Sequence, residues 1–396
     1  MSSPDSQDRV SEIQIYLVDL SQDEPYLGAL REGEAVNEAG YFVRKGNRTV
    51  YPRKNRSLVV KIVTRDGVTG WGETYGLVAP LATAAIISDL LTGFVVGRDP
   101  NEVEAIHDDL YDLMRVRGYT GGFYLDALAA IDIALWDVVG KIQNLPLYEI
   151  LGSPRRSLIP AYVSGLPRPT LAGRLELARE WQSLGFNAFK FALPVADEGA
   201  LAELSALRLT LGDDARIAVD LHWSLTEDAA VQLAADLQPF DPWFLEAPVP
   251  TEEIGTLRRV VQRTAACIAV GEEWRTHFDA RLRLERLACH IVQPEMGHTG
   301  ITQFLRIARL AETYRISVIP HATIGSGIFL AASLHAGAVL TEVESHEFQH
   351  SIFGAFRHFT GDALRCEAGA YSLPDGPGLG VEPSDAMLAR MTRMLP

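Results

Sequence analysis

The chain has 396 residues, which is too long for one small core and suits a large β/α unit with an accessory domain. Its composition, 47% hydrophobic and 22% charged residues, is typical of a soluble globular protein. The formal net charge of −15 disfavours the basic face that a nucleic-acid-binding protein needs, so we exclude nucleic acid as a partner.

The N-terminal part of the chain predicts a unit of mixed strands and helices. Residues 12–20 alternate apolar and polar side chains, as in a half-buried strand. Residues 57–74 form two apolar runs around Asp66-Gly67, which is a strong signal for a β-hairpin. Residues 80–117 are mainly helical in pattern. We therefore expect an α+β domain here.

A strongly apolar helix follows this domain. Apolar residues recur at helical spacing through Trp136, and Asn144-Leu145-Pro146 ends the helix. Asp132 and Asp137 lie within this apolar stretch. We expect both to be structural carboxylates with satisfied hydrogen bonds rather than catalytic groups.

Beyond residue 158 the pattern becomes regular, because short apolar runs alternate with amphipathic helical segments. The runs start roughly 20–30 residues apart, which is the period of a β/α repeat. Eight such units favour a closed (β/α)₈ barrel over an open sheet. The runs are residues 159–165, 186–193, 216–223, 243–248, 267–273, 290–295, 316–321 and 344–350.

Three consecutive runs end in an acid: Asp220, Glu246 and Glu272. In a β/α barrel the carboxyl ends of the strands meet at one mouth, so the three carboxylates should converge. Converging anions repel one another unless a cation lies between them, and Mg²⁺ prefers oxygen ligands of this kind. We therefore predict a Mg²⁺ site formed by these three residues.

Other polar groups end the neighbouring runs, and together with the three acids they place eight polar groups on one rim, which indicates a shared active site. His222 lies two residues after Asp220, and residues i and i+2 of a strand share a face, so we expect both in one cavity. The remaining groups are Lys190, Glu295, His321 and Glu347.

These residues resemble those of the enolase superfamily, in its mandelate racemase-like subgroup. Asp220, Glu246 within FLEAP and Glu272 within VGEE match the metal triad of the family. His321 within VIPH and Glu295 within VQPE match its His–acid dyad, although the acid is usually Asp. The resemblance extends over nearly the whole chain, through AAIDIALWDVVGK to PGLGVE. It implies an essential Mg²⁺ and a capping domain over the barrel mouth.

Two positions place the chain within that family. The second run carries Lys190-Phe191-Ala192, whereas racemases and many relatives carry Lys-x-Lys. Asp220-Leu221-His222 resembles the Asp-x-His pattern of acid-sugar dehydratases, of which the galactonate dehydratase-like branch is the nearest match. The implied domains are an N-terminal α+β cap at 1–125, the catalytic barrel at 126–370 and a segment at 371–396 that returns to the cap.

The chemistry that these residues allow begins with removal of the proton α to a carboxylate. Histidine is a suitable base near neutral pH, so His321 is our candidate, with Glu295 fixing its tautomer. His222 would then protonate the β-hydroxyl as it leaves. Lys190 would bind the substrate carboxylate or the enediolate, and Glu347 would donate a hydrogen bond if protonated. The expected product is a 2-keto-3-deoxy acid.

The substrate would be a sugar acid, either an aldonate or an aldarate. The long polar segment 21–55 carries Arg44 and Lys45, which we expect to contact the substrate, unless this segment is only a solvated surface loop. The alternatives are a racemase, epimerase or cycloisomerase on the same scaffold and, less favoured, a non-catalytic sugar-acid binding protein. We expect a cytoplasmic protein without a membrane span, because the N-terminus is polar, no run of about 18 uncharged apolar residues occurs, and the three cysteines show no disulfide spacing. The resemblance further implies a homo-oligomer.

Overall fold

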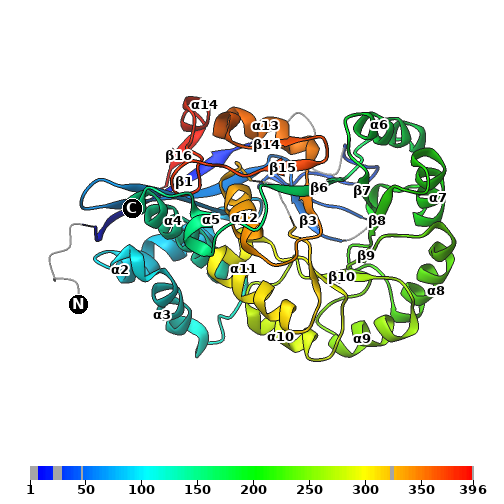
Figure 1. The fold of residues 1–396 in the computed structure, drawn as a ribbon, viewed down its shortest axis with the longest axis horizontal. Helices are drawn as coiled ribbons and strands as arrows, with labels where there is room; N and C mark the ends of the chain where they lie inside the picture. The colour runs from blue at the N-terminus through cyan, green and yellow to red at the C-terminus, as the bar shows by residue number, and fades with distance from the viewer. Residues whose placement is uncertain (1–7, 21–28, 46–47, 322–324, 395–396) are drawn as a thin grey trace.

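The computed structural model describes residues 8–20, 29–45, 48–321 and 325–394, apart from the side chains of 355–357. Figure 1 shows an N-terminal sheet with helices α2 and α3 at one end of the molecule, and a larger β/α unit at the other. In that larger unit, helices α6 to α10 lie around the outside of the strands. Among the described residues, no single helix is long and apolar enough to span a membrane, and only the bent pair Pro80–Val95 and Pro100–Arg115 reaches that length and composition jointly.

The N-terminal sheet has four antiparallel strands in the order β16-β1-β4-β5. The predicted strand and hairpin are confirmed as β1, β4 and β5, and the hairpin turns at Gly67 with a φ of 83°. A short ribbon, β2–β3, lies in the long polar segment. The strands are β1 (Val10–Asp19), β2 (Tyr41–Val43), β3 (Val50–Pro52), β4 (Arg56–Thr64), β5 (Thr69–Tyr75) and, from the C-terminal segment, β16 (Met391–Arg393).

Helices cover one face of this sheet. The predicted apolar helix is α4 (Gly122–Gln143), and it ends at Asn144 in the left-handed conformation. α4 lies so close to β5 that a Cβ on Gly72 would come within 1.9 Å of the Ala130 carbonyl oxygen, so this position requires glycine. The other helices here are α1 (Pro80–Ala85), α2 (Thr92–Val95), α3 (Val103–Arg115) and α5 (Leu147–Leu151).

Asp137 of α4 joins three parts of the chain. Its carboxylate accepts hydrogen bonds from the backbone N–H of Trp71 in β5 and of Leu379 in the C-terminal segment, each at 2.8 Å, and pairs with Lys141. Asp132 Oδ2 accepts from the N–H of Thr302 in α11 at 3.0 Å, whereas its buried Oδ1 has no hydrogen-bond partner among the described residues. Both are structural carboxylates as predicted, but the expectation of satisfied hydrogen bonds is confirmed in full only for Asp137.

Each of the eight predicted runs contains one parallel strand, in the order β13-β6-β7-β8-β9-β10-β11-β12. Antiparallel β14 and β15 extend this sheet beside β6. The strands are β6 (Leu158–Ser164), β7 (Ala188–Ala192), β8 (Arg216–Asp220), β9 (Leu245–Glu246), β10 (Ile268–Val270), β11 (Ile291–Val292), β12 (Ser317–Val318), β13 (His346–Phe348), β14 (Arg365–Glu367) and β15 (Ala370–Ser372).

The parallel strands do not form a closed ladder within the described residues. No strand pairing joins β12 to β13, and one hydrogen bond, from the Glu347 N–H to the Pro320 carbonyl at 3.2 Å, links the segments that contain them. The fold is thus α/β with a large mixed sheet, and the expected closed barrel is not formed by strand pairing.

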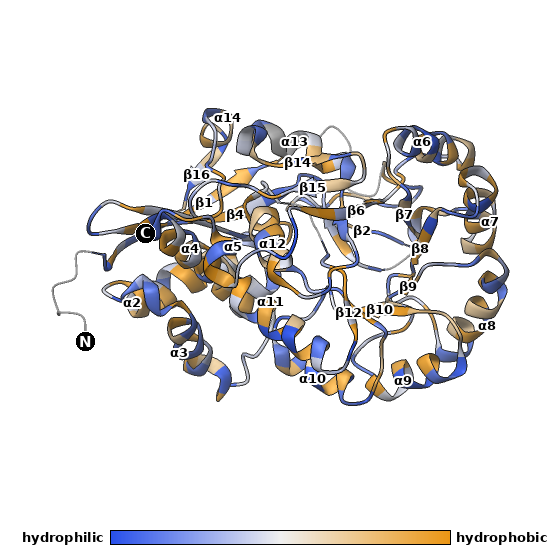
Figure 2. Ribbon diagram, in the orientation of Figure 1, coloured by the Kyte–Doolittle hydropathy of each residue, from blue (hydrophilic) through white to orange (hydrophobic). Residues whose placement is uncertain are grey.

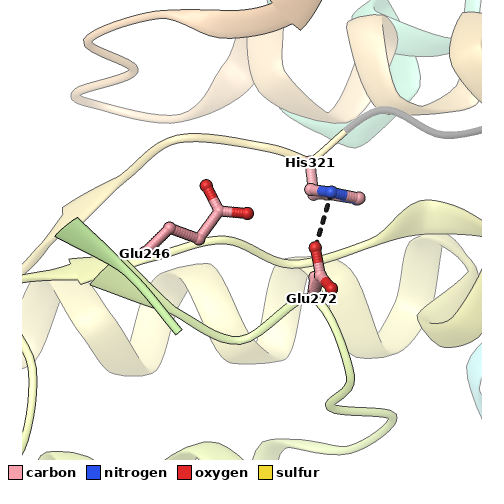
Figure 3. A group of neighbouring side chains, drawn as sticks. All are labelled: Glu246, Glu272 and His321. Atoms are coloured by element: carbon pink, nitrogen blue, oxygen red, sulfur yellow. Dashed lines mark ion pairs between the residues drawn. The ribbon is translucent and has the colours of Figure 1, made fainter. Parts of the chain in front are cut away.

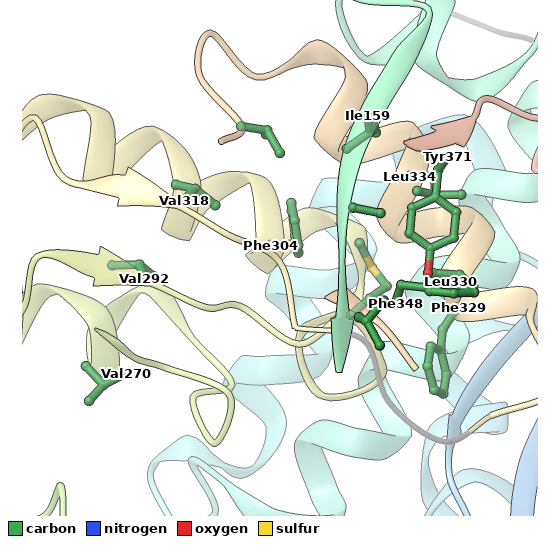
Figure 4. Close-up of a cluster of buried hydrophobic side chains, with 14 of the residues drawn as sticks. Ile159, Val270, Val292, Phe304, Val318, Phe329, Leu330, Leu334, Phe348 and Tyr371 are labelled. Atoms are coloured by element: carbon green, nitrogen blue, oxygen red, sulfur yellow. The ribbon is translucent and has the colours of Figure 1, made fainter. Parts of the chain in front are cut away.

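Helices alternate with these strands and complete the core. α4 packs against α11 and β5 against α12, so α11 and α12 join the two units. Figure 2 shows α12 largely in hydrophobic colours, and Figure 4 shows core side chains from strands and helices together. The helices are α6 (Leu171–Ser183), α7 (Ala200–Leu211), α8 (Glu227–Leu237), α9 (Ile254–Arg263), α10 (His277–Leu284), α11 (Met296–Thr313), α12 (Ile328–Val339), α13 (His350–Thr360) and α14 (Asp385–Leu388).

Candidate active site

A cavity of about 340 Å³ lies where the carboxyl ends of the parallel strands meet. Six residues of the predicted rim line it: Lys190, Asp220, His222, Glu272, His321 and Glu347. Glu246 and Glu295 are each 1% exposed and contact these lining residues from behind. The structure therefore brings together all the rim residues that the sequence singled out.

Two of the three predicted metal ligands, Glu246 and Glu272, lie in one cluster with His321. Ligand atoms of Glu246, Glu272 and His321 lie within 4.8 Å of one another (Figure 3). Asp220 turns instead to His222, with Oδ2 2.9 Å from Nε2 of that ring. Burial raises the pKa of Glu246 to about 7; Lys190 opposes this rise, and neighbouring carboxylates add to it. The cluster therefore has more negative charge than its side chains compensate.

His321 is held between two carboxylates. Its Nδ1 lies 2.7 Å from Glu295 Oε2, and its Nε2 lies 2.6 Å from Glu272 Oε2. Glu295 is fixed in turn, because Oε1 accepts a hydrogen bond from the Gly297 N–H at 3.0 Å. Glutamate in place of the usual aspartate thus reaches the imidazole. Against the effect of burial, Glu347 and Glu272 raise the pKa of His321 well above its ordinary value.

His222 reaches the cavity by a different route from the one predicted. β8 ends at Asp220, and both His222 and Trp223 have left-handed backbone conformations, with φ of 49° and 53°. Strand alternation therefore does not apply at His222, and the argument from i and i+2 was wrong. A turn places the ring beside Asp220, whose Oδ1 also accepts the His222 N–H at 2.9 Å. Despite burial, Asp220 raises the pKa of His222.

Lys190 is buried between two acids. Its Nζ lies 2.8 Å from Glu246 Oε2 and 3.1 Å from Glu347 Oε1. Glu347 also accepts hydrogen bonds from the Ser164 hydroxyl and from Gln349 Nε2. Against the effect of burial, the two acids raise the pKa of Lys190 well above its ordinary value, which makes this residue a fixed cation.

Arg44 and Lys45 do not line the cavity, which corrects the predicted contact with substrate. Arg44 is 1% exposed, and Nη1 lies 2.9 Å from Glu34 Oε2. Lys45 Nζ donates to the Glu32 carbonyl at 2.8 Å. The described part of this segment instead contributes Thr49 and Tyr51 to the cavity. We predicted substrate contacts for this segment only because it contains basic residues. The number of basic residues does not show which side chains face the cavity.

The structure also adds residues that the rim pattern missed. Tyr75, Arg275 and His298 line the cavity, and Asp126 of α4 contacts both Arg275 and His298. Arg275 and His298 each lie three residues after a strand-end acid, and this spacing was the available signal. Glu273 lines the cavity as well, but Thr251 donates to its carboxylate, and burial raises its pKa.

The fold and this rim define an acid–base enzyme whose active site lies at the strand ends of a β/α unit, beneath a cap. Comparisons with known proteins give the family. The model of the mandelate racemase/muconate lactonizing enzyme N-terminal domain matches residues 48–152, and that of the enolase C-terminal domain-like family matches residues 174–387. The chain belongs to the enolase superfamily, in its mandelate racemase subgroup.

Several relatives cover nearly the whole chain. D-galactonate dehydratase of Xanthomonas campestris pv. campestris (strain B100) is 32% identical over 365 residues, covering 86% of this chain and 92% of the relative. A structure from Sinorhizobium meliloti, provisionally assigned as an isomerase, is 56% identical with a TM-score of 0.97, covering 98% and 100% of the two chains. The 3,6-anhydro-D-galactonate cycloisomerase of Zobellia galactanivorans is 27% identical with a TM-score of 0.82, covering 97% and 99%.

These relatives identify the chain as an enzyme, with hydro-lyases among those of similar sequence. The non-catalytic binding protein is thereby set aside.

Proposed function

We propose that this enzyme is a Mg²⁺-dependent dehydratase of a sugar acid, an aldonate or an aldarate, that forms a 2-keto-3-deoxy acid. The observation that carries the proposal is a pair of histidines facing one cavity, each held by its own carboxylate. His222 follows the third parallel strand and His321 the seventh. If the eight strands close into a ring, as the Glu347–Pro320 hydrogen bond supports, these two strands are opposite each other. Dehydratase activity in the curated relatives supports the same reaction.

His321 is the base that removes the α-proton. Glu295 accepts the hydrogen bond of Nδ1, so Nε2 faces the cavity, where Glu272 and Glu347 favour the protonated ring. With Glu272 holding a cation instead, Nε2 would be released from this ion pair to accept the proton. The α-proton is weakly acidic, and its removal leaves negative charge on the substrate carboxylate. That charge needs an electrophilic partner beyond the histidine itself.

The acidic cluster fits a hard divalent cation. Carboxylates from adjacent strands supply oxygen donors, and burial together with these neighbouring carboxylates raises the pKa of Glu246 against the effect of Lys190. Asp220, Glu246 and Glu272 would hold Mg²⁺. When bound, this ion supplies Lewis-acid stabilisation of the charge that develops on the substrate carboxylate.

His222 is the acid that completes the elimination. Its raised pKa, caused by Asp220, favours the imidazolium form, which donates a proton to the β-hydroxyl. The C–O bond breaks, water leaves, and the resulting enol takes up a proton at C3 to give the keto acid. Lys190 stays a cation between Glu246 and Glu347, so it binds the substrate carboxylate rather than acting as a second base.

The His222→Asn variant separates the two steps of this reaction. Because His321 is intact, exchange of the α-proton in D₂O should stay within about tenfold of the wild-type rate. Elimination should fall by about 10²–10³-fold, since a general acid contributes that order of rate. NMR follows both in one sample, and His290→Asn, at an exposed histidine before β11, is the matched control. Unchanged elimination would show that His222 is not the acid.

A second candidate is an isomerase on the same scaffold, either a racemase, an epimerase or a cycloisomerase. The relatives from Sinorhizobium meliloti and Zobellia galactanivorans favour it. Proton transfer on both faces of one carbon requires a second base. Ala192 takes the place of the second lysine, and Lys190 is held as a cation, so only His222 remains for that role among the described lining residues.

A further inference from the structure

One wall of the cavity is built differently from the rim of acids. Tyr75 of β5, Arg275 before α10 and His298 of α11 line it. His298 stacks on Tyr75 with ring centroids 4.3 Å apart, so this wall adjoins the N-terminal sheet. Asp126 of α4 lies behind, 3% exposed. If the substrate carboxylate lies on the acidic rim, this wall is the part of the cavity that faces its remaining carbons.

Arg275 is already paired with a carboxylate of the protein, that of Asp126. Its Nε lies 2.9 Å from Asp126 Oδ1 and its Nη2 3.3 Å from Oδ2, while Nη1 donates to the Glu273 carbonyl at 2.9 Å. Burial raises the pKa of Asp126, but His298 and Arg275 together hold it below its ordinary value, so the acid is ionised. The Asp126–Arg275 pair therefore presents no net charge to the cavity.

His298 adds a hydrogen-bonding group to the wall. Its Nδ1 lies 2.8 Å from Asp126 Oδ1 and 3.2 Å from Arg275 Nη2. Among the described residues no partner is bonded to Nε2, so this nitrogen is available to a substrate hydroxyl. The guanidinium N–H groups and this ring nitrogen match hydroxyl groups, which both donate and accept.

A second carboxylate would fit this wall poorly. Lys190 and Arg275 carry the only permanent positive charges among the described residues that line the cavity, and both are already paired with buried acids. An anion removed from water without a partner is strongly disfavoured, and the carboxylates of the rim would repel it. Asp220, Glu272, Glu273 and Glu347 line the cavity, and Glu246 and Glu295 lie directly behind them.

We propose that the enzyme selects mono-acid sugars over di-acids, with Asp126 setting this selectivity by neutralising Arg275 and orienting His298. Arg275 and His298 contact the hydroxylated tail of the substrate, and Asp126 is a positioning residue behind them. This inference rests on the proposed function, since it names the substrate class of the same site.

The test uses pairs of acids that share their hydroxyl configuration and differ only at C6: D-galactonate with galactarate, and D-gluconate with D-glucarate. For the wild-type enzyme with Mg²⁺, we expect the mono-acid of a pair to be favoured at least tenfold in kcat/KM and in calorimetric affinity. Asp126→Asn leaves Arg275 as an uncompensated cation and should shift the ratio about tenfold toward the di-acid, mainly through KM.

Two further variants serve as a second test and as a control. Arg275→Gln leaves Asp126 as the uncompensated charge and should shift the ratio in the opposite direction, which decides the matter if Asp126→Asn does not fold. Asp108→Asn breaks a comparable pair with Arg306, at 2.5 and 3.0 Å between α3 and α11, and should leave the ratio unchanged.

The outcomes separate this inference from the proposed reaction. Turnover to keto acids with a preference for di-acids, or ratios unmoved by both wall variants, would overturn the inference and leave the dehydratase assignment standing. A calorimetric preference for mono-acids without keto-acid formation would uphold the inference and refute dehydration. Absence of both binding and turnover across all pairs would overturn both.

Discussion

Replacing His321 with asparagine is expected to lower kcat for the sugar acid by about 10³-fold or more, because the amide cannot accept the α-proton. Glu295 would still find a hydrogen-bond donor in the amide, so the buried dyad acid is not left unpaired. This variant should lose α-proton exchange in D₂O together with elimination. His222→Asn, by contrast, should retain the exchange, and this difference assigns the two histidines to their separate steps.

The control for this variant is its structure and its metal response. Circular dichroism should match that of the wild type within error, and Mg²⁺ should still raise the melting temperature. A His321→Asn enzyme that exchanges the α-proton at the wild-type rate would contradict the assignment of the base.

Removal of the divalent cation is expected to abolish turnover, by about 10³-fold or more, and Mg²⁺ should restore it. The physical reason is the group of buried carboxylates around Glu246, whose pKa is raised to about 7 by burial and by the neighbouring acids, against the effect of Lys190. Mg²⁺ held by these residues would bind the folded state preferentially, so it should also raise the melting temperature. At a hundredfold excess over Kd the stabilisation is about 2.7 kcal/mol.

A matched pair of variants tests where the ion binds. Glu246→Gln removes a buried ligand and should abolish the Mg²⁺-induced rise in melting temperature. Glu104→Gln, at an exposed acid of α3, should preserve it. Activity and melting temperature that do not respond to EDTA would contradict the metal site.

Most of the fold could be predicted because its signals are local. Each parallel strand lies within its own apolar run, and Asp66-Gly67 and Asn144 mark a turn and a helix end through their own backbone preferences. The predicted closure of the sheet is not local in this sense, because it depends on contacts between separate strands of the repeat. Within the described residues no strand pairing joins β12 to β13, and the Glu347 N–H donates to the Pro320 carbonyl between them.

The residues of the candidate site could likewise be predicted only where their signals are local. The rim acids were predictable because a strand end fixes their position, whereas His222 depends on a left-handed turn that strand alternation does not describe. The sequence did not show whether Glu295 can take the place of aspartate. The distance of 2.7 Å between Glu295 Oε2 and His321 Nδ1 shows that it reaches the imidazole. The wall formed through Asp126 was beyond sequence reasoning, because its contacts with Arg275 and His298 span 149 and 172 residues.

The central claim is that proton abstraction leads to loss of water. Wild-type enzyme, Mg²⁺ and a mono-acid sugar are incubated in D₂O and followed by NMR. The account predicts a 2-keto-3-deoxy acid with one deuterium at C3, and no substrate of inverted configuration. Substrate that returns inverted and deuterated at the α-carbon, or an isomer formed without loss of water, would contradict dehydration and establish the isomerase reaction instead.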